Sequence, residues 1–378
     1  MRVLSVDIGV RPAGTAAEKE AARYIADQLR SYGYEVDEHP FPFESEIGRE
    51  VSLQRTGPEQ GPIEAFPLSG SPAGEASGNL VFAGLGRQDE FPPEGLSGRL
   101  ALIERGQVFF SDKVANAAAA GAAAAIIFNN EPGLFAGDLG RPGAIPTVAI
   151  SDEDGAALRT LLERGPVEVS IRVGPPVKGT ARNVIARPED QPGAPCETVS
   201  GGHYDTTPNG PGANDNASGT AAVLELARVT RARGLAGNHC FVLFGAEEIG
   251  LLGSAAFVAS LSEAERQALK GMLNFDVVSS GERLELIGWP ELVQTGADAA
   301  RGAGIPVTTG EQMSNAGSDH QSFITAGIPA VHFIRTGGDF LSSIIHTPQD
   351  TIAIVRPADL EQVVTLGALL LAALERSD

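Results

Sequence analysis

The sequence predicts an α/β protein: a three-layer α/β/α domain around a mixed, mostly parallel sheet, interrupted by a smaller β-rich insert. Three observations support this prediction. A helix and a strand open the chain, a Gly- and Pro-rich stretch with short β-like runs covers about residues 45–177, and strands alternate with helices from Arg182 onward. Such alternation places helices on both faces of a sheet.

The first predicted element is a helix over residues 14–33. Thr15 and Glu18 form a capping-box pattern, in which both side chains satisfy free backbone N–H groups at a helix start. Apolar residues recur behind them at helical spacing, and Gly33 ends the pattern. A strand over about residues 34–43 follows, which is a start typical of α/β chains.

The stretch 45–177 is predicted to form an inserted domain without chemistry of its own. It is rich in glycine and proline and has no cluster of His, Asp and Glu at metal-ligand spacing. Helices are predicted at Asp112–Ala120 and at about Asp152–Arg164. Short strands are predicted at Asn79–Phe82, Arg99–Ile103, Ala124–Phe128, Pro146–Ile150 and near Val167–Val173.

The strand–helix rhythm returns at Arg182 and continues to the last helix. Strands are predicted at Asn183–Ala186, Glu197–Gly201, Cys240–Phe244, Met272–Phe275, Leu284–Ile287 and Ala330–Ile334. Helices are predicted near residues 217–233, 248–268, 290–303 and 357–375. Ligands of such sheets bind beyond the carboxyl ends of the strands, so functional side chains are expected there.

The composition limits the function classes. The chain has 378 residues, of which 42% are hydrophobic, so it is long enough for two domains with a large core. Its net charge of −20 argues against nucleic acid and anionic membrane surfaces as partners, because both bind clustered Lys and Arg. The apolar run Ala368–Leu374 is too short to cross a bilayer.

Location and redox state are expectations from the same sequence. The N-terminal segment lacks the apolar core of a secretory signal, so the chain as written is expected to be cytoplasmic, and secretion is expected if its start is truncated. Cys196 and Cys240 lie in apolar runs and lack metal-ligand spacing. We therefore expect two buried free thiols.

Metal-type side chains follow the first strand of the second half. His203 and Asp205 lie at its end, and Asp215 precedes the next helix. A neutral imidazole nitrogen binds zinc, and a carboxylate two residues further on accepts its other N–H and fixes the tautomer. Asp215 has two carboxylate oxygens and is suited to bridge two cations.

Further candidates follow the later strands. Glu247 and Glu248 come after an apolar strand, where their mutual repulsion would destabilise a purely structural site. A divalent cation removes that objection, because one carboxylate ligates while the other accepts a proton. Asp276 ends the next strand, and His346 lies on a loop before the last helix. This set of nitrogen and oxygen donors favours zinc, and a pair of ions about 3.5–4 Å apart would activate water and polarise a carbonyl.

The order and spacing of these motifs resemble those of the co-catalytic dizinc aminopeptidases, zinc exopeptidases related to bacterial leucyl aminopeptidases and glutamate carboxypeptidases. The resemblance covers residues 10–44 and about 178–378. It implies a zinc-peptidase domain formed by residues 1–44 and 178–378. The insert, 45–177, is similar to the protease-associated domain found inside many members.

The resemblance also implies roles for single residues. The implied ligands are His203, Asp215 and Asp276 for one zinc ion, and Asp215, Glu248 and His346 for a second. Glu247 would be the general base, and Asp205 would be the outer partner of His203. A cis peptide is implied at Asp215–Asn216. Cobalt and manganese stay open as the native ions.

One position departs from the family pattern. Many members carry a tyrosine immediately before the last ligand, where its hydroxyl assists the oxyanion, and this chain has Ile345. Oxyanion stabilisation must then come from the metal ions or another group. His320 and Asp319 are candidates for oxyanion or substrate contact, with structural hydrogen bonding as the alternative for both. Asp350 is either an outer partner of the site or a helix-capping acid, with helix capping slightly favoured.

The predicted function is metal-assisted peptide hydrolysis by an aminopeptidase, because acidic groups beside the ions suit an N-terminal ammonium. A carboxypeptidase or dipeptidase is the nearest alternative. It needs a cation for the terminal carboxylate, and Arg335, just after a predicted strand, is the candidate. A non-catalytic binding module and a single-zinc cyclase are disfavoured, because every ligand position is filled. The sequence does not determine side-chain preference, physiological substrate or oligomeric state.

Overall fold

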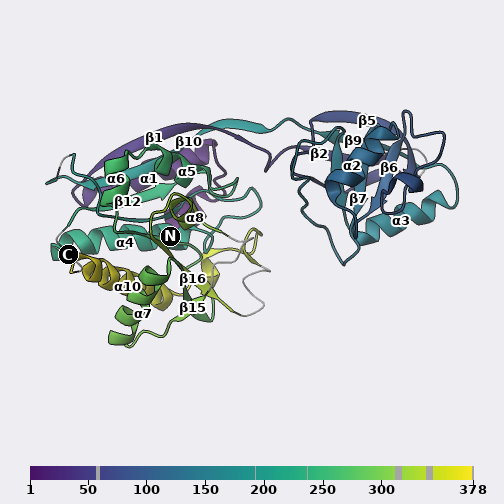
Figure 1. Ribbon diagram of the computed structural model, residues 1–378. Helices are drawn as coiled ribbons and strands as arrows, with labels where there is room; N and C mark the ends of the chain where they lie inside the picture. The colour runs from purple at the N-terminus through teal and green to yellow at the C-terminus, as the bar shows by residue number, and fades with distance from the viewer. Residues whose placement is uncertain (57–59, 192, 236, 311–316, 338–343, 377–378) are drawn as a thin grey trace. The chain divides into compact units, whose positions relative to one another are not determined.

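The chain is described by a computed structural model that covers residues 1–56, 60–191, 193–235, 237–310, 317–337 and 344–376. It divides into two compact units. One unit is formed by Met1–Phe43 and Gly179–Asp378, and the other, Glu44–Lys178, is inserted between these segments. Each unit contains its own sheet (Figure 1), and each sheet has eight strands.

The sheet of the first unit is mixed and mostly parallel, as predicted. Its strands lie in the order β1 (Tyr34–Ser45), β10 (Val177–Pro188), β12 (His239–Phe244), β11 (Thr198–His203), β13 (Gly271–Phe275), β16 (Ala330–Thr336), β14 (Arg283–Gly288) and β15 (Thr308–Gly310). β11 pairs in parallel with both β12 and β13, and β13 with β16, whereas β10–β12 and β14–β16 are antiparallel. β11, β12 and β13 are buried along their whole length, as is typical of parallel strands covered on both faces.

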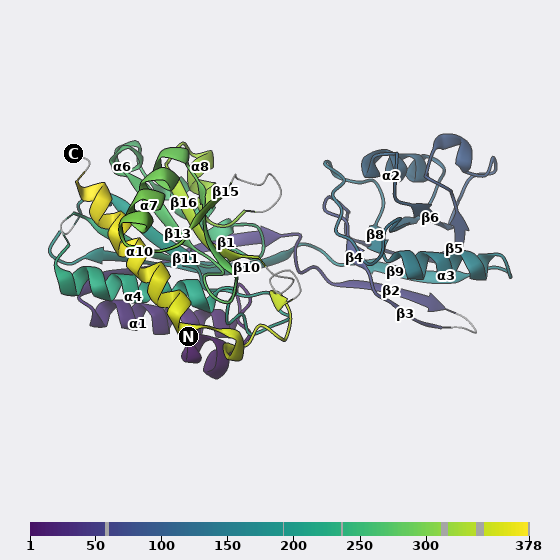
Figure 2. The ribbon, with the colours of Figure 1, turned by 90° about the horizontal axis from the view of Figure 1, so that it is seen from below.

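Alternate residues of one strand pack into two different cores, one on each face of the sheet. The first unit therefore has three layers, with the sheet in the middle. On β12, Phe241 and Leu243 belong to one core cluster, and Val242 and Phe244 to another. The first core includes residues of α1 (Ala16–Ser31), α4 (Ala217–Arg233), α7 (Pro290–Gly302) and α10 (Pro357–Glu375). The second includes residues of α5 (Leu252–Ser260) and α8 (His320–Thr325). Helices accordingly flank both faces of this sheet (Figure 2).

The first helix starts where its N-cap predicts. The Thr15 hydroxyl accepts a hydrogen bond from the Glu18 N–H at 3.2 Å. The second half of the predicted capping box does not form, because the Glu18 carboxylate accepts a hydrogen bond from the Tyr204 hydroxyl at 2.5 Å. Glu18 thereby ties α1 to the residue after β11.

The single helix predicted over 248–268 is two helices, α5 and α6 (Glu263–Ala268). Ser262 and Glu265 form a complete capping box, which starts a new helix. Leu251, before α5, adopts the left-handed region with φ 59°. The segment after β12 is therefore a turn, and Glu247 and Glu248 lie in it rather than in a helix.

The prediction of two free thiols is wrong. Cys196 and Cys240 form a disulfide, with Cα atoms 5.7 Å apart. Cys196 precedes β11 and Cys240 lies on β12, its parallel neighbour, in which Thr198 pairs with His239. The pairing of these strands brings together two cysteines that are 44 positions apart in the sequence.

The inserted unit has a second mixed sheet with helices packed on it. Its strands lie in the order β3 (Gly61–Ile63), β2 (Val51–Thr56), β9 (Glu168–Val173), β5 (Gly74–Phe82), β6 (Leu100–Glu104), β7 (Ala124–Phe128), β8 (Thr147–Ile150) and β4 (Phe66–Pro67). α2 (Phe110–Ala119) and α3 (Asp152–Leu162) pack on this sheet. Within the described part of this unit, no three His, Cys, Asp or Glu side chains converge as a metal site would need.

α10 is, among the described residues, the one helix that is long and apolar enough to cross a membrane by length and composition. The core helix of a globular domain meets the same criterion. Val363, Leu366 and Leu370 of α10 are buried in the first core, where α10 contacts α4 and α7.

Candidate active site

The predicted metal ligands and Glu247 lie together beyond the carboxyl ends of neighbouring strands in the sheet of the first unit. β11 lies between β12 and β13 and is parallel to both, so the carboxyl ends of the three strands lie side by side. His203 is the last residue of β11, Glu247 and Glu248 follow β12, and Asp276 directly follows β13. The strand order itself therefore gathers these side chains.

Three donor atoms surround a first position. His203 Nε2 lies 3.2 Å from Asp215 Oδ1 and 3.3 Å from Asp276 Oδ1. Ligands bound to a tetrahedral zinc ion at about 2.0–2.1 Å lie roughly 3.3 Å from one another. The spacing and chemistry of these atoms fit a zinc ion.

A second group shares Asp215. His346 Nε2 lies 3.0 Å from Asp215 Oδ2 and 3.1 Å from Glu248 Oε2. The two oxygens of Asp215 thus face two different histidines, each with a further carboxylate beside it. Asp215 thus has the position that a carboxylate bridging two cations would need.

Glu247 lies at the rim of the first group. Its Oε2 is 3.8 Å from His203 Nε2, further than the corresponding oxygens of Asp215 and Asp276. The side chain is 11% exposed, so it lies close to a ligand position and is not completely buried.

Asp205 holds the turn that carries both glutamates. Its carboxylate accepts hydrogen bonds from the Glu247 N–H at 3.1 Å and the Glu248 N–H at 3.3 Å. Its Oδ1 also lies 3.5 Å from His203 Nδ1, and its role as the outer partner of that imidazole stays a prediction. Asp205 therefore connects the end of β11 to the turn after β12.

The loop before α4 is tied to the end of β13. The Asp215–Asn216 peptide is cis, as the family resemblance implied. The Asn216 side chain accepts from the Gly219 N–H at 2.8 Å, which caps α4, and donates to the Phe275 carbonyl at 2.9 Å. A Cβ on Gly219 would overlap that same carbonyl oxygen, so only glycine lets α4 approach β13 this closely.

Left-handed backbone conformations concentrate at the site. Ala246, Val277 and His346 have φ of 60°, 53° and 63°. The first two adjoin Glu247 and Asp276, and the third is itself a candidate ligand. Such sparsely populated conformations in residues other than glycine cluster at functional sites.

The electrostatics of the site match a bound cation. Burial raises the pKa of Glu247 well above its usual range and the pKa of Glu248 to about 7. Hydrogen bonds to the carboxylates of Asp215 and Glu248 raise the pKa of His346 to about 11. The cluster thus needs positive charge, and a divalent cation that displaces protons from the imidazoles supplies it.

The remaining sequence-based candidates lie in different settings. Asp319 is fully buried, and burial raises its pKa to about 7. The buried ring of His320 stacks on His332, with ring centroids 4.7 Å apart, and burial lowers the pKa of His320 to about 2. Ile345 is half-buried beside His346 and brings no hydrogen-bond donor in its side chain. The roles of Asp319 and His320 in oxyanion or substrate contact stay predictions.

Arg335 and Asp350 differ from their predicted settings. Arg335 is buried and forms an ion pair with Asp359 at 3.2 Å, so its guanidinium is already engaged. Asp350 is not a helix-capping acid, since α10 begins after Arg356. Its carboxylate accepts from the Asn214 and Asp215 N–H groups at 2.7 and 3.0 Å.

Arg11 is a component of the site's support that the sequence did not reveal. It is completely buried, and its guanidinium donates to the carbonyls of Tyr204, Pro211 and Gly212 at 2.6, 2.6 and 3.1 Å. A lone arginine in the N-terminal segment carries no motif that would predict these contacts.

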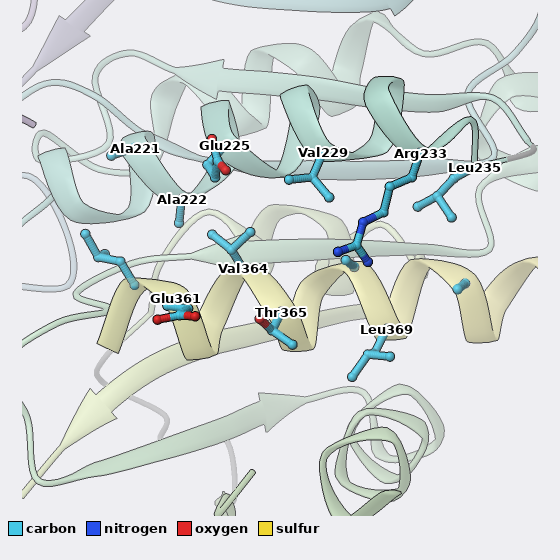
Figure 3. A pocket seen from close by; sticks show the side chains of 13 residues that line it. Ala221, Ala222, Glu225, Val229, Arg233, Leu235, Glu361, Val364, Thr365 and Leu369 are labelled. Atoms are coloured by element: carbon cyan, nitrogen blue, oxygen red, sulfur yellow. The ribbon is translucent and has the colours of Figure 1, made fainter. Parts of the chain in front are cut away.

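A separate apolar groove of about 570 Å³ lies between α4 and α10. Figure 3 shows Val229 of α4 facing Val364 of α10 across it. None of the side chains that line this groove belongs to the cluster around Asp215. It is therefore not part of the candidate metal site.

Comparison with known proteins agrees with this geometry. Residues 183–370 match peptidase family M28, and residues 76–158 match the PA domain. Aminopeptidase YwaD of Bacillus subtilis is 35% identical over an alignment of 397 positions, which covers 98% of this chain and 82% of that protein.

Two further relatives extend the comparison. The solved structure of BSAP, a zinc aminopeptidase from Bacillus subtilis, has a TM-score of 0.78 and 32% identity over 98% of this chain and 91% of that one. A probable leucine aminopeptidase 2 of Aspergillus oryzae is 34% identical over 71% of this chain, which spans about half (54%) of that longer protein. The convergence of ligand-type side chains, the fold and these similarities lead to one conclusion: the chain is a metallopeptidase of peptidase family M28 and carries a PA domain within its peptidase domain.

Proposed function

We propose that this chain is an aminopeptidase that binds two zinc ions and removes N-terminal residues from peptides. The observation that carries the proposal is the position of Asp215, whose two oxygens lie 3.2 Å from His203 and 3.0 Å from His346. His203 and Asp276 would complete one zinc site, and Glu248 and His346 the other. When bound, the zinc ions supply Lewis acidity for the peptide carbonyl and lower the pKa of water.

Glu247 is the proposed general base. Its Oε2 lies 0.5–0.6 Å further from His203 Nε2 (3.8 Å) than the Asp215 and Asp276 oxygens do (3.2 and 3.3 Å), a separation that suits a group just outside a coordination sphere. From there Oε2 takes a proton from the attacking water and returns it to the leaving amine. Asp205 fixes the backbone from which this side chain extends by accepting the Glu247 N–H.

The direction of cleavage is proposed from the charges around the site. A carboxypeptidase needs a free cation to hold the C-terminal carboxylate of its substrate. Arg335 is paired with Asp359, and the Arg11 guanidinium is buried and bonded to backbone carbonyls. Acidic side chains instead dominate the cluster and suit a peptide's N-terminal ammonium. The named aminopeptidases among the relatives support the same direction.

Glu247→Gln tests the proposal. We expect the variant to bind zinc like the unmodified protein and to lose about 10²–10⁴-fold in kcat, the usual contribution of a general base. Exposed Glu361→Gln on α10 is the matched control and should change neither quantity. Hydrolysis of an aminoacyl anilide and of an N-blocked peptide with a free C-terminus should be compared. Normal turnover by Glu247→Gln would refute the assigned base, and cleavage of the N-blocked peptide alone would refute the aminopeptidase.

A further inference from the structure

Asp350 connects two loops of the site that are far apart in the sequence. It is 1% exposed and lies four residues after His346. Its Oδ1 accepts from the Asn214 N–H at 2.7 Å, its Oδ2 accepts from the Asp215 N–H at 3.0 Å, and its carbonyl accepts from the Ala213 N–H at 3.1 Å. The loop that carries His346 thus binds the backbone of the loop that carries Asp215.

We infer that Asp350 is a positioning residue, which sets the Asp215 carboxylate between the two metal positions and keeps the His346 loop in register with it. The inference rests on the proposed dizinc function. Asp215 must present one oxygen to each side, so a small rotation of its backbone would misplace both oxygens together. The hydrogen bond from its own N–H to Asp350 opposes that rotation.

The opposite side of the same loop is held by Arg11. The guanidinium binds the carbonyls of Pro211 and Gly212, while Asp350 binds the N–H groups of the residues that follow. The Arg11 guanidinium therefore fixes the carbonyl groups of this loop, and the Asp350 carboxylate fixes its N–H groups. Of these two anchors, Asp350 alone belongs to the loop that carries His346.

Asp205 makes the same kind of contact elsewhere in the site. Each aspartate is buried and places its two oxygens on two successive backbone N–H groups. Asp205 does this for Glu247 and Glu248, and Asp350 does it for the loop of the bridging ligand. Carboxylates bound this way form charge-assisted hydrogen bonds, which are stronger than neutral ones and fix geometry.

The test uses Asp350→Ala and Asp350→Asn in the full chain. Metal-free protein is titrated with zinc by calorimetry, and kcat and KM are then measured at saturating zinc. Residues that orient metal ligands typically contribute on the order of 10–100-fold to metal affinity or activity. We expect Asp350→Ala to weaken the lower-affinity zinc site by that factor and to lower kcat with KM unchanged.

Asp350→Asn keeps one acceptor oxygen and should lose less in both measurements. It also keeps the test decisive if Asp350→Ala does not fold. Gln349→Ala, an exposed neighbour in the same loop, is the control and should match the unmodified protein.

Two results would overturn the inference. One is that both variants bind two zinc ions and turn over substrate like the unmodified protein. The other is that they lose thermal stability alone, with zinc affinity and kcat intact. Failure of the dizinc proposal is distinguishable, because the unmodified protein itself would then bind fewer than two ions.

Discussion

Asp205→Asn perturbs the site through a single atom. The native carboxylate is fully buried, binds the N–H groups of Glu247 and Glu248, and lies against His203. Asparagine has the same shape, but its NH₂ group cannot accept a hydrogen bond. One of the two backbone N–H groups will therefore face another donor.

The expected magnitude follows from these contacts. A hydrogen bond to a charged group contributes about 1.5–3 kcal/mol, so the loss of one should lower the free energy of unfolding by about that amount. The displaced turn also carries Glu247 and Glu248. We expect kcat to fall on the order of 10–100-fold, as for other residues that orient metal ligands.

Two measurements check this prediction. Urea unfolding of the metal-free protein gives the loss of stability, and hydrolysis of an aminoacyl anilide at saturating zinc gives kcat. Asp27→Asn, in an exposed ion pair with Arg30, is the control. It removes the same charge and should cost less than about 1 kcal/mol, with kcat unchanged.

A variant that loses stability but keeps its full kcat would show this prediction to be wrong. Asp205 would then hold the turn without orienting the glutamates for the reaction. Unchanged stability and unchanged kcat would show that its two hydrogen bonds contribute nothing.

Changes at Arg335, at His346 and at the Cys196–Cys240 disulfide give three further tests. Arg335→Met should leave kcat/KM unchanged for aminoacyl and C-terminally free substrates, because its guanidinium pairs with Asp359; a selective loss on C-terminally free peptides would favour a carboxypeptidase. In metal-free protein the pKa of His346 is raised from 6.5 to about 11 by its hydrogen bonds to Asp215 and Glu248. The protonated imidazole therefore stabilises the folded protein fully below pH 6.5, and this contribution is lost as the pH rises toward 11. The Tm difference between the unmodified protein and His346→Asn should shrink over that range, and a constant difference would contradict the pairing. Reduction of Cys196–Cys240, which closes a loop of 44 positions, should lower the free energy of unfolding by about 4 kcal/mol in the loop-entropy estimate, and an unchanged urea midpoint would argue against the disulfide.

Local patterns were enough to predict most of the sheet that builds the site. Apolar runs placed β11, β12 and β13 to within two residues, and His203, Glu247 and Asp276 were expected at their ends. Parallel pairing then brings these ends together without any further information. The convergence of the candidate site was predictable because it depends on strand order and not on detailed packing.

Contacts between distant segments were not predictable in the same way. The disulfide depends on the register of β11 against β12, which no local signal specifies. Asp350 was interpreted as a helix cap because capping is a local pattern, whereas its real partners lie about 135 positions earlier in the chain. Arg11 has no signature at all, since its acceptors are backbone carbonyls of other loops.

Anomalous scattering from crystals grown with zinc would show whether Asp215 bridges two metal ions. We expect two peaks about 3.5–4 Å apart, one beside His203 and Asp276 and the other beside Glu248 and His346, with one Asp215 oxygen directed at each. A single peak, or two peaks that Asp215 does not join, would contradict it.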